Sequence, residues 1–142
     1  MQKTILITGA TSGFGKACAL AFAKETHRLI LTGRRAERLE SEAKSLSSVY
    51  CVEVLTLNFD VRDREAVKKA IDNIPEAWRN IDILINNAGL AAGSDPIQDG
   101  NIDDWEQMID TNIKGLLYVT KSVFPLMLKS TRTNWTASIR HS

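Results

Sequence analysis

Three glycines near the N-terminus follow a short apolar run and could build a phosphate-binding turn. They are spaced Gly9-x-x-x-Gly13-x-Gly15, and a helical pattern follows at once. Glycines let backbone amides approach a pyrophosphate, and a new helix offers its unpaired N–H groups and positive dipole end to the same anion. Thr11 or Ser12 can cap this helix, because a hydroxyl accepts from a free backbone N–H. The spacing is a variant of the general dinucleotide pattern, and the alternative interpretation is a plain turn between a strand and a helix.

A pair of arginines follows the second apolar run. The segment reads Thr32-Gly33-Arg34-Arg35 and contains no acid. NAD-selective sites usually place an acid here, about 20 residues after the glycines, to bond the ribose 2′-OH. Guanidinium groups can instead form charge-assisted bonds to a 2′-phosphate. The segment therefore predicts NADP(H) as the cofactor, and the alternative is a solvated basic start to a helix.

Apolar runs that alternate with helical patterns must position these residues. Strands are predicted at residues 4–8, 28–32, 52–57 and 83–85. Four helices are predicted. They cover residues 13–25, begin at about residue 36, begin after Asp63 as a capping residue, and run from Asp103 to Lys129. The strands are continuously apolar, as expected where helices cover both faces of a sheet. This alternation predicts a parallel α/β sheet with right-handed crossovers.

Apolar residues recur at helical spacing in two of these segments, which supports the two helices. The expected apolar positions of the first helix are Phe14, Ala17, Cys18, Leu20 and Ala21. Those of the long helix are Ile109, Ile113, Leu116, Leu117, Val119 and Val123. Pro125 should kink or weaken the last turns of the long helix. The loop of residues 90–100 leaves the carboxyl end of the fourth strand, where ligands of open α/β sheets bind.

Size and composition predict one soluble globular domain. The chain has 142 residues, of which 44% are hydrophobic, and a net charge of +1. This charge predicts no partnership with nucleic acid or an anionic membrane, and no apolar run approaches the ~20 residues that span a bilayer. No signal peptide is expected, because the first apolar run breaks at Gly9. Cys18 and Cys51 lack metal-ligand spacing, so we expect buried, reduced thiols, no metal site and a cytoplasmic location.

Three motifs, taken in order, resemble those of the short-chain dehydrogenase/reductase family. They are Thr8-Gly9-x-x-x-Gly13-x-Gly15, Asn86-Asn87-Ala88-Gly89 and Asp110-Thr111-Asn112. The resemblance covers about residues 1–129, and residues 13–15, 32–38 and 81–90 are most similar to the NADP-dependent serine or 3-hydroxy acid dehydrogenase branch. We therefore expect a Rossmann-type three-layer α/β fold with strand order 3-2-1-4, truncated after the fourth strand and the following long helix.

The resemblance implies roles for the residues of each motif. The glycines would surround the cofactor phosphates, Asp60 and Val61 would meet the adenine, and the segment after the fourth strand would support the ribose. Asn112 would be the catalytic-site asparagine that bends its helix and holds a water in the proton relay. Alternatively, Asp60 only ends a strand and Asn112 only caps or bends a helix, since such side chains commonly bond nearby backbone groups. The predicted cofactor-binding residues are Gly9, Thr11, Ser12, Gly13, Phe14, Gly15, Arg34, Arg35, Asp60, Val61, Asn87, Ala88 and Gly89.

The Tyr-x-x-x-Lys pair of that family has no counterpart here. In the family the tyrosine exchanges a proton with the substrate oxygen while hydride moves to or from nicotinamide. Tyr50 is followed four residues later by Val54, and Tyr118 by Ser122. Residues 130–142 are interpreted as an atypical tail after an NADP(H)-binding domain of residues 1–129. The hypothesis for this ending is a truncated or frame-shifted reading of a longer protein.

The motifs favour an NADP(H)-dependent oxidoreductase that acts on a small hydroxy acid or carbonyl. The alternative is an NADP(H)-binding fragment or pseudoenzyme that binds NADPH weakly and has little or no turnover. The expected partners are a small-molecule substrate and, by the resemblance, a second copy packed on the long helix as a homo-oligomer. In the other interpretation, the apolar stripe of that helix serves only the sheet.

Overall fold

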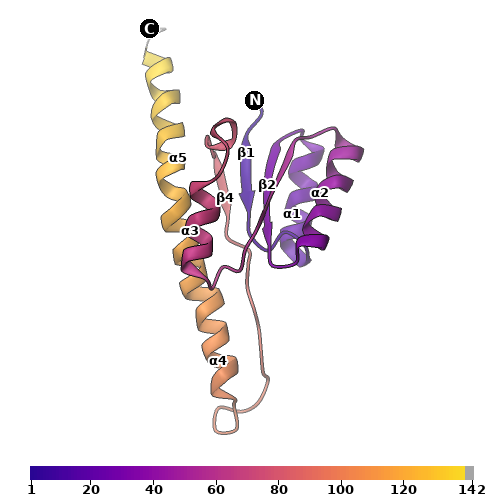
Figure 1. Ribbon diagram of the computed structural model, residues 1–142, viewed down its shortest axis with the longest axis vertical. Helices are drawn as coiled ribbons and strands as arrows, with labels where there is room; N and C mark the ends of the chain where they lie inside the picture. Colours follow the sequence, from indigo (N-terminus) through magenta and orange to yellow (C-terminus); the bar gives the residue numbers. More distant parts are fainter. Residues whose placement is uncertain (140–142) are drawn as a thin grey trace.

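Strands and helices alternate along the chain as the apolar runs predict (Figure 1). The computed structural model describes residues 1–139, with side chains described for residues 1–130. The strands are β1 (Thr4–Ile7), β2 (Arg28–Gly33), β3 (Val54–Asn58) and β4 (Ile83–Ile85). The α-helices are α1 (Gly13–Lys24), α2 (Ala36–Tyr50), α3 (Arg64–Asp72), α4 (Ile102–Ile109) and α5 (Leu116–Ile139). A 3-10 turn (Glu76–Trp78) precedes β4, and a π-helical segment (Asp110–Gly115) joins α4 to α5.

The four strands form one parallel sheet in the order β3-β2-β1-β4. Leu6 of β1 lies opposite Ile30 of β2 on one side and Leu84 of β4 on the other. This is the predicted order of the first half of a doubly wound fold, so the expected fold class is confirmed. β4 is an edge of the sheet among the described residues.

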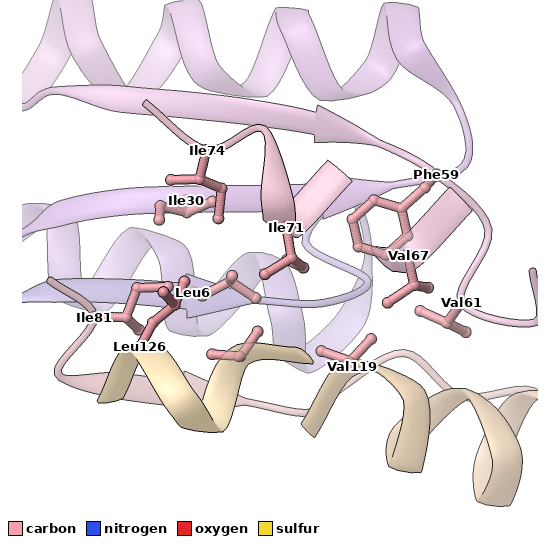
Figure 2. Packing of buried hydrophobic residues seen from close by; sticks show 11 residues of the cluster. Leu6, Ile30, Phe59, Val61, Val67, Ile71, Ile74, Ile81, Val119 and Leu126 are labelled. Carbon is pink, nitrogen blue, oxygen red and sulfur yellow. The ribbon is translucent and has the colours of Figure 1, made fainter. Parts of the chain in front are cut away.

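Each face of the sheet is covered by helices, which gives three layers. Successive side chains of a strand point to opposite faces, so Ile5 and Ile7 join one apolar cluster while Leu6 joins the other. The first cluster packs under α1 and α2, and the second packs under α3 and α5. Figure 2 shows the second cluster, in which Ile71 and Val119 face the central strands.

Small residues, and not the bulky apolar ones, form the buried face of α1. Its buried residues are Gly15, Ala19 and Ala23, whereas Phe14 is 85% exposed and Leu20 is 37% exposed. Small residues let the helix backbone approach the sheet closely, and the bulky apolar residues are therefore displaced to the rim. The helical spacing of Phe14 and Leu20 indicates the helix correctly, but neither residue belongs to its buried face.

The helix ends show which capping predictions hold. Asp63 caps α3 as predicted, because its carboxylate accepts from the N–H of Ala66 at 3.0 Å. Ser12 occupies the N-cap position of α1 but makes no side-chain capping bond, so that prediction was wrong. Cys51 follows α2 in the left-handed conformation (φ +55°) and is exposed, which corrects its expected burial. Cys18 is only partly buried.

The long helical region is interrupted once and extends further than predicted. The helix continues through Pro125 to Ile139, past the expected end at Lys129. Val119 and Val123 are buried. The other apolar residues at helical spacing are exposed by 41–58%, namely Ile109, Ile113, Leu116 and Leu117. No helix in the described part of the chain is both long and apolar enough to span a bilayer.

Candidate functional site

A pocket lies where the carboxyl ends of the four strands meet. All the predicted cofactor-binding residues line it except Gly13, Phe14 and Gly15. Five residues that were not predicted complete the lining, namely Thr32, Gly33, Phe59, Leu90 and Thr111. The segments that follow β1, β2, β3 and β4 are distant in sequence, and the parallel topology brings their ends to one edge of the sheet.

The first part of the glycine turn lines this pocket through Gly9, Thr11 and Ser12. Gly9 and Gly13 adopt positive φ angles of 62° and 53°, which side-chain-bearing residues rarely adopt. A Cβ on Gly13 would meet no atom within 4 Å, so the turn is open above it. A Cβ on Gly15 would collide with the carbonyl oxygen of Gly9 and the amide of Asn87. Gly15 is therefore needed for close packing of α1 on the turn.

A buried threonine hydroxyl joins the glycine turn to the segment after β4. Thr8 is 1% exposed, and its Oγ1 accepts from the backbone N–H groups of Asn87 at 3.0 Å and Ala88 at 2.9 Å. The side chain of Asn87 in turn donates to the carbonyl oxygen of Gly9 at 3.0 Å. These bonds hold two walls of the pocket together. Thr8 was part of the recognised motif, but its role was not predicted because it depends on a tertiary contact.

The arginine segment is also held by backbone contacts. The N–H of Ala10 donates to the carbonyl oxygen of Thr32 at 3.1 Å. The carbonyl oxygen of Gly33 accepts from Nδ2 of Asn58 at 2.8 Å and from the N–H of Phe59 at 3.2 Å. The chain that leads into Arg34 and Arg35 is thus tied to both neighbouring strand ends. Asn58 is a positioning residue that the motif analysis did not identify.

Asp60 lies at the same rim in an ion pair. Its Oδ2 is 2.7 Å from an Nη2 of Arg62, and Nε of Arg62 lies 3.1 Å from both carboxylate oxygens. These hydrogen bonds from Arg62 lower the pKa of Asp60, and Arg34 adds a smaller effect in the same direction. Asp60 is therefore a charged group whose carboxylate is engaged by a side chain that does not line the pocket.

Asn112 fastens the loop after β4 to the helical region. It lies in the π-helical segment, where its Oδ1 accepts from the N–H of Leu90 and its Nδ2 donates to the carbonyl oxygen of Leu90, both at 2.8 Å. Its neighbour Thr111 lines the pocket. The side chain of Asn112 thus positions the loop beside Gly89, and its predicted catalytic role remains a prediction.

Tyr118 and Tyr50 lie elsewhere. Tyr118 lines a groove between α3 and α5 together with Lys121 and Ser122, and this groove shares no residue with the pocket at the strand ends. Tyr50 ends α2 and packs against the cluster on the other face of the sheet. Neither tyrosine is placed to exchange a proton with a ligand in the pocket.

The pocket has the features of a site for a phosphorylated nucleotide. The turn offers backbone amides at the N-terminus of α1, where the helix dipole favours an anion. Two arginines lie at the next strand end, and guanidinium groups are suited to bind phosphate. The residues present therefore fit an anionic dinucleotide, from its diphosphate at the glycine turn to a further phosphate near Arg34 and Arg35.

Several curated proteins are similar to the chain over nearly its whole length. It is 52% identical over 130 residues to sulfoacetaldehyde reductase 2 of Chromohalobacter salexigens. It is 50% identical over 129 residues to serine 3-dehydrogenase of Rhizobium radiobacter. It is 46% identical over 128 residues to an NADP-dependent 3-hydroxy acid dehydrogenase of Salmonella typhi. These matches cover 90–92% of the chain and 50–51% of each relative, so the chain spans about half the length of these relatives.

Solved structures agree with the sequence matches. The closed form of serine dehydrogenase complexed with NADP⁺ superposes with a TM-score of 0.80 at 44% identity, over 89% of this chain and 49% of that chain. An NAD⁺-bound xylitol dehydrogenase superposes with a TM-score of 0.84 at 33% identity, over 89% of this chain and 48% of that chain. The family model for short chain dehydrogenases matches residues 3–134. With its fold and strand order, these matches show that the chain belongs to the short chain dehydrogenase family.

Proposed function

We propose that this chain binds NADP(H) as the cofactor-binding part of a short-chain oxidoreductase, with residues 1–129 as the binding domain. The observation that carries the proposal is the pair Arg34 and Arg35 at the rim of the pocket that begins at the glycine turn. No ion pair engages either arginine among the residues whose side chains are described. Both guanidinium groups can therefore meet the 2′-phosphate that distinguishes NADP(H) from NAD(H).

The proposed substrate is a small hydroxy acid or carbonyl compound. This rests on the names of the relatives, which include a serine dehydrogenase, a 3-hydroxy acid dehydrogenase and a sulfoacetaldehyde reductase. When bound, the nicotinamide of the cofactor gives or accepts the hydride. The chain's own contribution would be to hold the adenine, ribose and diphosphate, and to fix the loop after β4 through Asn112.

A second candidate function is cofactor binding without turnover. It concerns these 142 residues alone, which contain no Tyr-x-x-x-Lys and place Tyr118 in a groove apart from the pocket. Loss of a general acid costs about 10²- to 10⁴-fold in rate. We therefore expect the 142 residues to bind NADPH weakly and to reduce carbonyl compounds slowly or not at all.

Titration of the purified chain with NADPH and NADH tests the proposal. We expect measurable binding with a preference for NADPH, and we expect Arg34→Ala with Arg35→Ala to weaken NADPH binding far more than NADH binding. Equal losses for the two cofactors would show that the arginines do not recognise the 2′-phosphate. Turnover assays with serine or a 3-hydroxy acid and NADP⁺ separate the two candidates, since robust activity would exclude binding alone.

A further inference from the structure

The charges around the pocket leave a conflict that the proposed function does not resolve. The charged residues of the lining are Arg34, Arg35 and Asp60, which together carry a net charge of +1. A carboxylate at this rim would repel a phosphate and would attract the same arginines that should bind it. An NADP(H) site with a free Asp60 would therefore work against its own selectivity.

Arg62 removes this conflict by pairing with Asp60 from outside the pocket. Its guanidinium contacts both carboxylate oxygens, at 2.7 Å and 3.1 Å, and its backbone N–H donates to Oδ1 at 3.0 Å. A turn closes around the pair, because the N–H of Asp63 donates to the carbonyl oxygen of Asp60 at 3.0 Å. The two side chains are 35% and 29% exposed, so solvent screens the pair only in part.

We propose that Arg62 determines cofactor selectivity by neutralising Asp60, which leaves Arg34 and Arg35 free for a 2′-phosphate. This inference rests on the proposed function. Counting Arg62, the local charge rises from +1 to +2. Arg62 does not line the pocket, so it acts through Asp60 and not by touching the ligand.

The position of Arg34 in the same pocket lining as Asp60 supports this role. The positive charge of Arg34 also makes a small contribution to the lowered pKa of Asp60. When Arg62 is absent, we expect Arg34, which lines the same pocket, to become the alternative partner of the carboxylate. A guanidinium that is paired with a carboxylate has fewer N–H donors for a phosphate. The loss should be specific to NADP(H), because NAD(H) carries no 2′-phosphate.

Four variants of the 142-residue chain test the proposal through the ratio of the NADH and NADPH dissociation constants. Arg62→Gln should reduce the preference for NADPH about tenfold. Asp60→Asn with Arg62→Gln should restore the wild-type ratio, because the local charge returns to +2. Arg62→Lys should keep most of the preference. Arg64→Gln is the matched control, since Arg64 is exposed, pairs with Glu65 at 3.3 Å and does not line the pocket.

The outcomes separate this inference from the proposed function. A wild-type chain with no NADPH binding or no preference would overturn both. A wild-type preference that survives Arg62→Gln unchanged would overturn the inference alone. If the double variant loses the preference, Arg62 acts other than through Asp60 and the inference is wrong. The test with the double variant remains valid even if the Arg62→Gln variant does not fold. Circular dichroism and urea unfolding show whether each variant is folded.

Discussion

The hydroxyl of Thr8 is the tie between β1 and the segment that follows β4, and its removal should have a measurable cost. In Thr8→Val the side chain keeps its shape and loses its oxygen. The N–H of Asn87 retains a second acceptor, the carbonyl oxygen of Ile85 at 3.1 Å. The N–H of Ala88 makes no other hydrogen bond among the described residues. One backbone donor is therefore left unpaired, which should cost about 1–3 kcal/mol of unfolding free energy.

Urea unfolding and amide hydrogen exchange together test this reasoning. Thr8→Ser is the matched control, because it keeps the acceptor and loses only a buried methyl group, worth about 1 kcal/mol. The stability losses of the two variants overlap, so the exchange data decide. In Thr8→Val, exchange of the Ala88 amide should accelerate more than exchange of the Asn87 amide. In Thr8→Ser the two amides should change together.

One result would refute the argument. If the Ala88 amide of Thr8→Val stays as protected as in Thr8→Ser, after correction for global stability, then the hydroxyl does not hold this segment. The distances of 2.9 Å and 3.0 Å to the two backbone nitrogen atoms would then have no energetic consequence.

Three further predictions concern single side chains. Asp63→Ala should lower the unfolding free energy by about 1 kcal/mol in urea denaturation, because the N-cap bond of α3 is lost, and an unchanged midpoint would contradict this. Asn112→Ala should raise the protease sensitivity of the loop that begins at Leu90, since both 2.8 Å bonds disappear; unchanged cleavage would show that the loop is held elsewhere. Arg62 lowers the pKa of Asp60 below its ordinary 3.8, so their pair stabilises the fold above that pH. This contribution is lost as the pH falls through the lowered pKa. NMR titration of the Asp60 carboxyl should show that its titration midpoint rises in Arg62→Gln, and an unchanged midpoint would contradict the role of Arg62.

The architecture could be predicted because its signals are local. Apolar runs bounded by glycine or polar residues mark the four strands, and their continuous hydrophobicity indicates a sheet covered on both faces. The face of α1 could not be predicted in the same way. Hydrophobic periodicity favours Phe14 and Leu20, yet the contact with the sheet uses Gly15, Ala19 and Ala23. Close approach depends on small side chains, which a count of apolar residues undervalues.

The binding segments of the site could be predicted from the sequence, whereas the hydrogen bonds that support them could not. The glycine turn and the arginine segment are contiguous in sequence and follow strands, so topology alone brings them to one edge. The contact of Thr8 with Ala88 joins the segments that follow β1 and β4, and the contact of Asn58 with Gly33 joins the ends of β3 and β2. Threonine and asparagine bond many partners, so their types carry no signal for a particular distant acceptor or donor. Only the structure identifies these supporting bonds.

The π-helical segment explains why the long helix could not be read as one continuous element. A Cβ on Gly115 would lie 2.7 Å from Cγ2 of Val61, so the helix passes very close to the segment that lines the pocket. Three residues earlier, Asn112 directs both its polar atoms to the backbone of Leu90. Gly115 and Asn112 lie within one turn of each other, yet one must face Val61 and the other must face Leu90. A π-bulge rotates the residues on its two sides relative to each other, compared with a regular α-helix. The π-helical segment therefore carries both contacts, which link the pocket wall at Val61 to the loop at Leu90.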